Sequence, residues 1–211
     1  GEYVVVKFAR WAFEKFEGVS DELGTQMRAV GEVMSLGRNY KEAFQKAIRS
    51  LEIGRYGLGF ARDFNQQSLE NLLRMIRTPN SERQFQMYEA LRKGADIQTL
   101  HDLTRIKAWF IEQMQELVKL EEEVLACRGG ELADELLARA KQDGFADGYL
   151  AGLLNIAESD IRTQRQRLGI EEAWEPVPVS GVDDAAYYYS TYNAPDRVPG
   201  SSRRKIMGLG G

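Results

Sequence analysis

The sequence predicts a mainly α-helical protein with a short α+β portion at its N-terminus. Apolar residues recur at helical spacing through most of the chain, while β-branched and aromatic residues gather in the run from Val4 to Phe8. Strand-like runs are absent from the middle of the chain. Gly54, Gly57 and Gly59 mark a flexible connection. We therefore expect a domain boundary near Ile53.

The first 52 residues are expected to form the α+β portion. Val4 to Phe8 predicts one strand, which a break at Ala9 and Arg10 interrupts before the pattern resumes over residues 11–13. A turn is expected to follow.

One helix is expected within this portion. Asn39 followed by Glu42 matches a capping box, in which each side chain bonds a free backbone N–H of the first turn. Apolar residues then follow at intervals of three and four: Tyr40, Ala43, Phe44, Ala47, Ile48 and Leu51. The pattern predicts a helix over residues 40–52.

Residues 53–202 are expected to form an all-helical domain followed by a linker. Pro79 ends the first helix, Ser81 and Asp96 are expected N-caps, and Gly169 is expected to stop the last helix. The apolar patterns predict helices over residues 69–76, 85–91, 106–125, 132–140, 149–153 and 161–168, and only a short turn from Asp96 through Leu103.

The C-terminal tail lacks a regular pattern. From Trp174 onward proline and glycine recur, with an aromatic cluster at residues 187–192 between them. This predicts a linker that packs locally. Residues 205–211 are expected to be a strand entering a glycine turn.

Composition excludes several classes of function. The net charge of −4 gives no overall basic surface for nucleic acid, and no apolar run approaches the ~20 residues of a membrane helix. Cys127 is the only cysteine and His101 the only histidine. An intrachain disulfide, a cysteine zinc cluster and a multi-histidine metal site are therefore excluded, and we expect a reducing, cytoplasmic location. His101 is expected to be a capping or partly buried polar group, and Cys127 to be inert.

Several segments together carry a resemblance to a known family. The run from Thr25 to Arg38 resembles the end of the first ATP-grasp half of the carbamoyl-phosphate synthase large subunit. The resemblance continues in residues 41–52, 103–110, 117–124, 144–147, 187–192 and 205–211. Residues 55–95 match only loosely, and the stretch between Val182 and Tyr187 is shorter than the usual linker of the family.

This resemblance implies an internal piece of a longer chain, because both ends fall within predicted elements. It divides the chain into the C-terminal end of the carboxyphosphate synthetic ATP-grasp domain (1–52), a helical oligomerization domain with its linker (53–202), and the first strand of the carbamoyl-phosphate synthetic domain (203–211). The piece is expected to link the two halves, to mediate oligomerization and to be inactive alone.

The resemblance also implies what the parent protein does. It would be an ATP-dependent carbon–nitrogen ligase that makes carbamoyl phosphate from bicarbonate, glutamine-derived ammonia and two ATP, for pyrimidine and arginine biosynthesis. Its implied cofactors are ATP, magnesium or manganese, and potassium. Its implied partners are the rest of the large subunit, a glutaminase small subunit and further copies of itself, with no nucleic acid and no membrane.

The resemblance places no catalytic, cofactor-binding or metal-binding residue in this piece. Met27 and Glu32 match family positions near the internal passage that carries carbamate between the halves. Without the family, Glu32 is interpreted as a solvated or hydrogen-bonded carboxylate next to a glycine.

Two other interpretations stay open. Residues 146–169 fit a helix-turn-helix DNA reader with Arg162, Arg165 and Arg167 on its second helix. Residues 131–170, however, carry five Arg or Lys against seven Asp or Glu, a net charge of −2, whereas such domains are normally basic. The third interpretation is a helical interaction module without an enzymatic parent.

Overall fold

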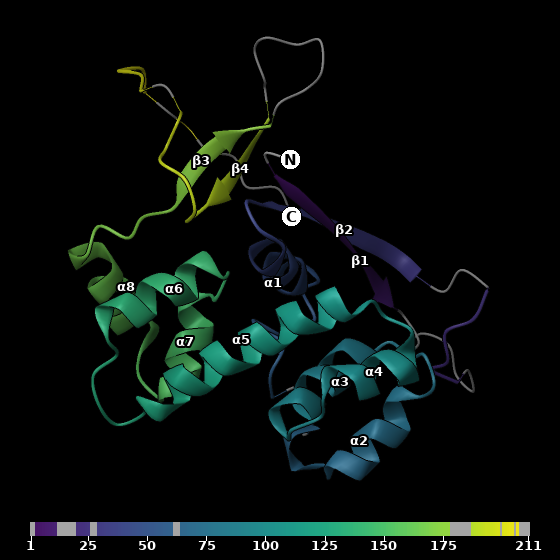
Figure 1. Cartoon of the computed structure of the whole chain (residues 1–211). Coiled ribbons are helices and arrows are strands. Elements are labelled where there is room, and N and C mark those ends of the chain that lie inside the picture. Colours follow the sequence, from purple (N-terminus) through teal and green to yellow (C-terminus); the bar gives the residue numbers. More distant parts are fainter. Residues whose placement is uncertain are drawn as a thin grey trace.

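The computed structural model describes residues 3–11, 20–25, 29–60, 64–177, 187–198, 200–204 and 206. It confirms a mainly α-helical fold with a small β portion. Figure 1 shows a group of helices flanked by a two-stranded β ribbon, with a second strand pair near helix α1. Within the described residues, no helix combines the length and the apolar character that crossing a bilayer requires.

The β ribbon consists of β1 (Val4–Trp11) and β2 (Ala29–Gly37), paired antiparallel. The expected break at Ala9 and Arg10 is wrong, because both residues pair with β2; the register shifts only after Arg10. Strand β2 was not predicted, since Gly31 and Gly37 interrupt its β-branched pattern. The turn expected after residue 13 lies outside the described residues.

Helix α1 (Tyr40–Ser50) follows the ribbon directly. Asn39 caps it as predicted, since its side chain accepts a hydrogen bond of 2.8 Å from the Glu42 N–H. The reciprocal bond of the capping box is displaced by one residue: the Glu42 carboxylate accepts from the Arg38 N–H at 2.8 Å. Phe44 of α1 packs against Phe8 of β1, with ring centroids 6.0 Å apart.

The helices from α2 to α8 form the helical body. They are α2 (Leu69–Ile76), α3 (Arg83–Arg92), α4 (Ile97–Thr104), α5 (Ala108–Ala126), α6 (Asp134–Gln142), α7 (Asp147–Leu154) and α8 (Glu158–Arg167), with a 3-10 turn at Phe64–Gln66 before them. Every helix predicted for this region is present, whereas the segment predicted as a short turn through Leu103 is the helix α4.

Of the two N-caps predicted within the helical body, one is confirmed and one is wrong. Asp96 caps α4 by accepting from the Thr99 N–H at 2.8 Å. Ser81 does not cap α3, which begins after Glu82 without a side-chain cap. The Ser81 hydroxyl instead donates to Asp21 at 2.6 Å, so it holds the segment between β1 and β2 against the helical body.

One hydrophobic core joins α1 to the helical body. Phe44 and Ile48 of α1 belong to the same buried cluster as Leu100, Ile111 and Leu137. The division of the chain near Ile53 stays a prediction.

The tail forms more structure than the predicted linker. Strands β3 (Ala173–Pro176) and β4 (Tyr188–Thr191) pair antiparallel, with Ala173 opposite Thr191. This strand pair was not predicted from the sequence, because each strand has only four residues and β3 ends in proline. The strand expected over residues 205–211 falls almost entirely outside the described residues.

Candidate functional site

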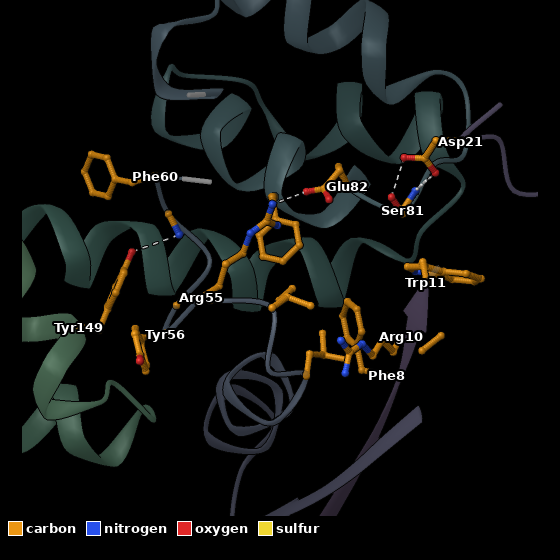
Figure 2. A pocket seen from close by; sticks show the side chains of 17 residues that line it. Phe8, Arg10, Trp11, Asp21, Arg55, Tyr56, Phe60, Ser81, Glu82 and Tyr149 are labelled. Carbon is orange, nitrogen blue, oxygen red and sulfur yellow. Dashed lines mark hydrogen bonds and ion pairs between the residues drawn. The ribbon is translucent and has the colours of Figure 1, made fainter. Parts of the chain in front are cut away.

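A cavity of about 770 Å³ opens where the β ribbon meets the helical body. Its walls come from the end of β1, the loop over residues 53–60 and the start of α3 (Figure 2). The side chains labelled in Figure 2 are Phe8, Arg10, Trp11, Asp21, Arg55, Tyr56, Phe60, Ser81, Glu82 and Tyr149.

The carboxylates in this cavity are already engaged. Asp21 accepts from the Ser81 N–H at 3.0 Å and from the Ser81 hydroxyl. Glu82 lies 2.7 Å from an Arg55 nitrogen, and the Arg55 guanidinium lies 3.9 Å from the centre of the Phe85 ring. These groups hold neighbouring segments together, and their arrangement is that of a packed junction between segments.

A buried carboxylate stands at the centre of the helical body. Glu121 on α5 is fully buried and accepts from the Tyr88 hydroxyl at 2.5 Å and the Tyr149 hydroxyl at 3.0 Å. It is also 2.5 Å from an Arg92 nitrogen. Burial raises the pKa of Glu121, against the opposite pull of Arg92 and the tyrosine hydrogen bonds. Burial and the charge of Glu121 raise the pKa values of both tyrosines.

The glycine-rich loop is packed against this network. The Gly59 N–H donates to the Tyr149 hydroxyl at 3.1 Å, and a Cβ added at Gly57 would lie 2.6 Å from the Tyr149 ring. At these two positions glycine allows the backbone to approach a side chain closely. The predicted flexible connection is therefore wrong for Gly57 and Gly59, whereas Gly54 has the positive φ of 74° expected of a turn glycine.

The two residues predicted to line a passage have different positions. Glu32 lies on β2 with an exposed side chain, 2.9 Å from the Lys7 nitrogen on β1. It is not among the residues that line the cavity at the junction. Met27 lies outside the described residues. The passage role of both residues stays a prediction.

The single histidine and the single cysteine of the sequence contact nearby backbone carbonyl groups. His101 Nδ1 is 2.7 Å from the Ile106 carbonyl oxygen, where it ties α4 to the turn before α5. The Cys127 thiol is 3.5 Å from the Glu123 carbonyl oxygen at the end of α5. Among the described residues no group of three potential metal ligands comes together.

Helices α7 and α8 form a helical pair around Asn155, which has a left-handed backbone at φ 58°. The three arginines of the second helix face carboxylates of the same chain. Their nearest carboxylate oxygens are Glu158 for Arg162 (3.0 Å), Asp147 for Arg165 (3.1 Å) and Asp134 for Arg167 (3.4 Å).

Comparison with known proteins identifies the family. A family model described as the carbamoyl-phosphate synthetase large chain, oligomerisation domain, matches residues 32–169. The chain belongs to this family. The match includes β2 from Glu32 onward, α1 and the whole helical body.

Relatives named carbamoyl phosphate synthase large chain align with the chain from end to end. The protein of Archaeoglobus fulgidus is 41% identical over 216 residues, covering 99% of this chain and 20% of the relative. Those of Synechocystis sp. and Pseudomonas aeruginosa are 40% and 39% identical over 214 residues, covering 100% of this chain and 20% of each relative. The chain thus spans about a fifth of the length of these relatives. The family resemblance inferred from the sequence is confirmed.

Proposed function

We propose that this chain is the joint of a carbamoyl-phosphate synthase large chain: it links the two synthetase halves and supplies a surface for self-association. The observation that carries the proposal is the match of residues 32–169 to the oligomerisation domain. The chain aligns in full with only a fifth of its relatives' length, so most of the parent lies in other segments.

The fold supports the linking role. The ribbon at the N-terminal end and the β3–β4 pair near the C-terminal end both approach α1 (Figure 1). Since α1 shares its hydrophobic core with the helical body, the elements at both ends of the piece are attached to one rigid unit. A joint of this kind would fix the distance between the segments that precede and follow it.

The surface at the start of α5 supports the self-association role. Trp109 and Phe110 are 49% and 39% exposed, and with Tyr40 they form an aromatic cluster with ring centroids 5.0 to 5.3 Å apart. Exposed aromatic groups of this size are typical of interaction surfaces.

The activity of the parent follows from the family. We propose that the full large chain is an ATP-dependent carbon–nitrogen ligase using bicarbonate, two ATP and ammonia that a glutaminase small subunit releases from glutamine. It would act in the cytoplasm, in pyrimidine and arginine biosynthesis, with magnesium or manganese and potassium. The nucleotide and metal contacts would lie in the other segments of the large chain, and Met27 and Glu32 would lie near the carbamate passage.

Nucleic-acid binding is not part of the proposal. Only Arg165 of α8 is mostly buried in its ion pair with Asp147, whereas Arg162 and Arg167 are more than half exposed. The local net charge of −2 disfavours a helix-turn-helix reader, since such domains are normally basic.

An activity comparison tests whether catalysis lies in the other segments of the large chain. The chain alone is expected to hydrolyse no ATP in the presence of bicarbonate and ammonia, while the full-length large chain with its small subunit makes carbamoyl phosphate. ATP turnover by this chain alone would contradict the proposal. So would a full-length protein that binds ATP but forms no carbamoyl phosphate from these substrates.

A further inference from the structure

Strand β4 lies beside β2 and is hydrogen-bonded to side chains of α1, although it is far from both in the sequence. Figure 1 shows the β3–β4 pair close to α1. The hydrogen bond from Thr191 to Glu42 joins residues 149 positions apart. Two charged side chains of α1, Glu42 and Lys46, make the contacts that hold this arrangement.

The Glu42 carboxylate connects three segments. Glu42 is only 1% exposed. One carboxylate oxygen accepts from the Arg38 N–H at 2.8 Å and from the Thr191 hydroxyl at 3.0 Å. The other accepts from the Tyr192 N–H at 3.2 Å. A carboxylate that receives donors from several directions in a buried place has a fixed orientation, so each donor is fixed relative to the others.

Lys46, one turn further along α1, makes a parallel connection. Its ammonium donates to the Leu36 carbonyl oxygen on β2 at 2.9 Å and to the Ser190 carbonyl oxygen on β4. Burial lowers the pKa of this ammonium, although the nearby charge of Glu42 acts in the opposite direction. The end of β2 and strand β4 are therefore bonded to the same face of α1 by two side chains of opposite charge.

The turn between α6 and α7 closes around the same place. The Gln142 carbonyl oxygen accepts from the side-chain amides of Asn39, at 3.3 Å, and Asn193, at 2.8 Å. A Cβ added at Gly144 would lie 2.9 Å from the Glu42 Cα, so this turn touches the backbone of α1. The junction thus joins the N-cap of α1, the residues after β4 and the helical body.

We propose that Glu42 is a positioning residue that aligns the two synthetase halves for transfer of the intermediate between them. This inference rests on the proposed function, in which β2 belongs to the first half and the chain after β4 leads to the second. Glu42 touches neither substrate nor cofactor in the proposal. It acts by fixing the Arg38 backbone at the end of β2 relative to Thr191 and Tyr192.

The consequence of misalignment follows from the chemistry of the intermediate. Carbamate that escapes between the halves reacts with water and returns bicarbonate and ammonia: H₂NCOO⁻ + H₂O → HCO₃⁻ + NH₃. The ATP that activated the bicarbonate has then been consumed without product. A loosened junction should therefore raise the ratio of ATP consumed to carbamoyl phosphate formed above its coupled value, since accurate positioning controls how a reactant is transferred.

The test uses the full-length large chain with its small subunit. In Glu42→Ala we expect the ratio of ATP consumed to carbamoyl phosphate formed to rise about twofold or more. Glu42→Gln keeps the shape of the side chain but only one of the two acceptor oxygens, so it should restore only part of the coupling. Glu112→Ala is the matched control, because Glu112 lies exposed on α5, and it should leave the ratio unchanged. A merely destabilising change would lower both quantities in proportion and leave their ratio constant.

A second variant keeps the test decisive if Glu42→Ala does not fold. Thr191→Val has nearly the same shape but removes the hydroxyl that donates to Glu42, while the bond from the Arg38 N–H remains. It is expected to raise the ratio less than Glu42→Ala does. Folded variants with the wild-type ratio would overturn the positioning role and leave the proposed function standing. A wild-type protein that forms no carbamoyl phosphate would instead overturn the proposed function.

Discussion

The helical body and the β ribbon differ in whether their charged and large apolar side chains are buried or exposed. In the helical body the carboxylate of Glu121 is fully buried and has donors from three side chains. In the ribbon the pair between Lys7 and Glu32 is more than half exposed on both sides, and Met34 is 68% exposed. The helical body therefore buries and pairs a charged group in its interior, whereas the ribbon leaves an ion pair and a large apolar side chain exposed.

The largest effect is expected at the buried carboxylate. Glu121→Ala removes the acceptor shared by Tyr88, Tyr149 and Arg92, and so leaves a buried guanidinium and two hydroxyls without it. We expect a loss of about 3–5 kcal/mol in the free energy of unfolding, measured by urea denaturation. Glu112→Ala, on the exposed side of the same helix, should change it by less than about 0.5 kcal/mol. Equal effects of the two changes would refute the contrast between buried and exposed groups.

A buried pair at the start of α7 should set part of the acid sensitivity. Burial alone would raise the pKa of Asp147, but the hydrogen bond and charge of Lys141, together with Arg165, hold it below the usual 3.8. Because the folded pKa is lowered, the ionised carboxylate stabilises the protein above pH 3.8, and this contribution is lost as the pH falls through the folded value.

The corresponding variant is Asp147→Asn. At neutral pH we expect Asp147→Asn to lower the free energy of unfolding by about 2 kcal/mol, because the charge of the buried Lys141 loses its counter-ion. Its stability should then fall less steeply than that of the wild type as the pH drops below 3.8. Glu32→Gln, in the exposed ribbon pair, should leave the loss of stability below pH 3.8 as steep as in the wild type. Thermal melts over a pH series measure the stability of each variant. If Asp147→Asn loses stability as steeply as the wild type at low pH, Asp147 does not contribute to the acid sensitivity.

A smaller effect is expected where the two regions join. Asn39→Ala removes the N-cap of α1 and should cost about 1 kcal/mol in chemical denaturation. Asn39→Asp keeps an acceptor for the Glu42 N–H but loses the amide that donates to the Gln142 carbonyl oxygen, so it should recover part of this loss. If Asp and Ala behave alike, the capping bond is not what stabilises the start of α1.

The smallest effect is expected in the ribbon. Met34→Thr places a β-branched residue on an exposed position of β2, so the stability of this chain should change by less than about 0.5 kcal/mol. A change above 1.5 kcal/mol, seen in the same denaturation experiment, would mean that Met34 is packed in solution and that the ribbon is not open on this side.

The helices could be predicted because their determinants are local. The spacing of apolar residues in α5 and the N-caps Asn39 and Asp96 act within a few positions of the sequence. The strands could not all be predicted, because β2 and β4 depend on partners distant in the chain. Ser81 was assigned as a cap on spacing alone, whereas its actual partner, Asp21, lies 60 positions away.

The junction could be foreseen only in part. Glu42 stood out in the sequence as a member of a capping box, but its bonds to Thr191 and Tyr192 cross most of the chain. No local pattern reports such contacts. The same limit applies to Gly57 and Gly59, where the pattern of a flexible loop is indistinguishable from that of a loop packed against Tyr149.

The central claim is that this piece carries a self-association surface of its own. Light scattering over a concentration series measures the solution mass directly, alone and at raised salt. The account predicts a concentration-dependent dimer or larger assembly that persists at raised salt, since apolar contacts such as those of Trp109 and Phe110 are not screened. A strict monomer at high concentration would contradict it.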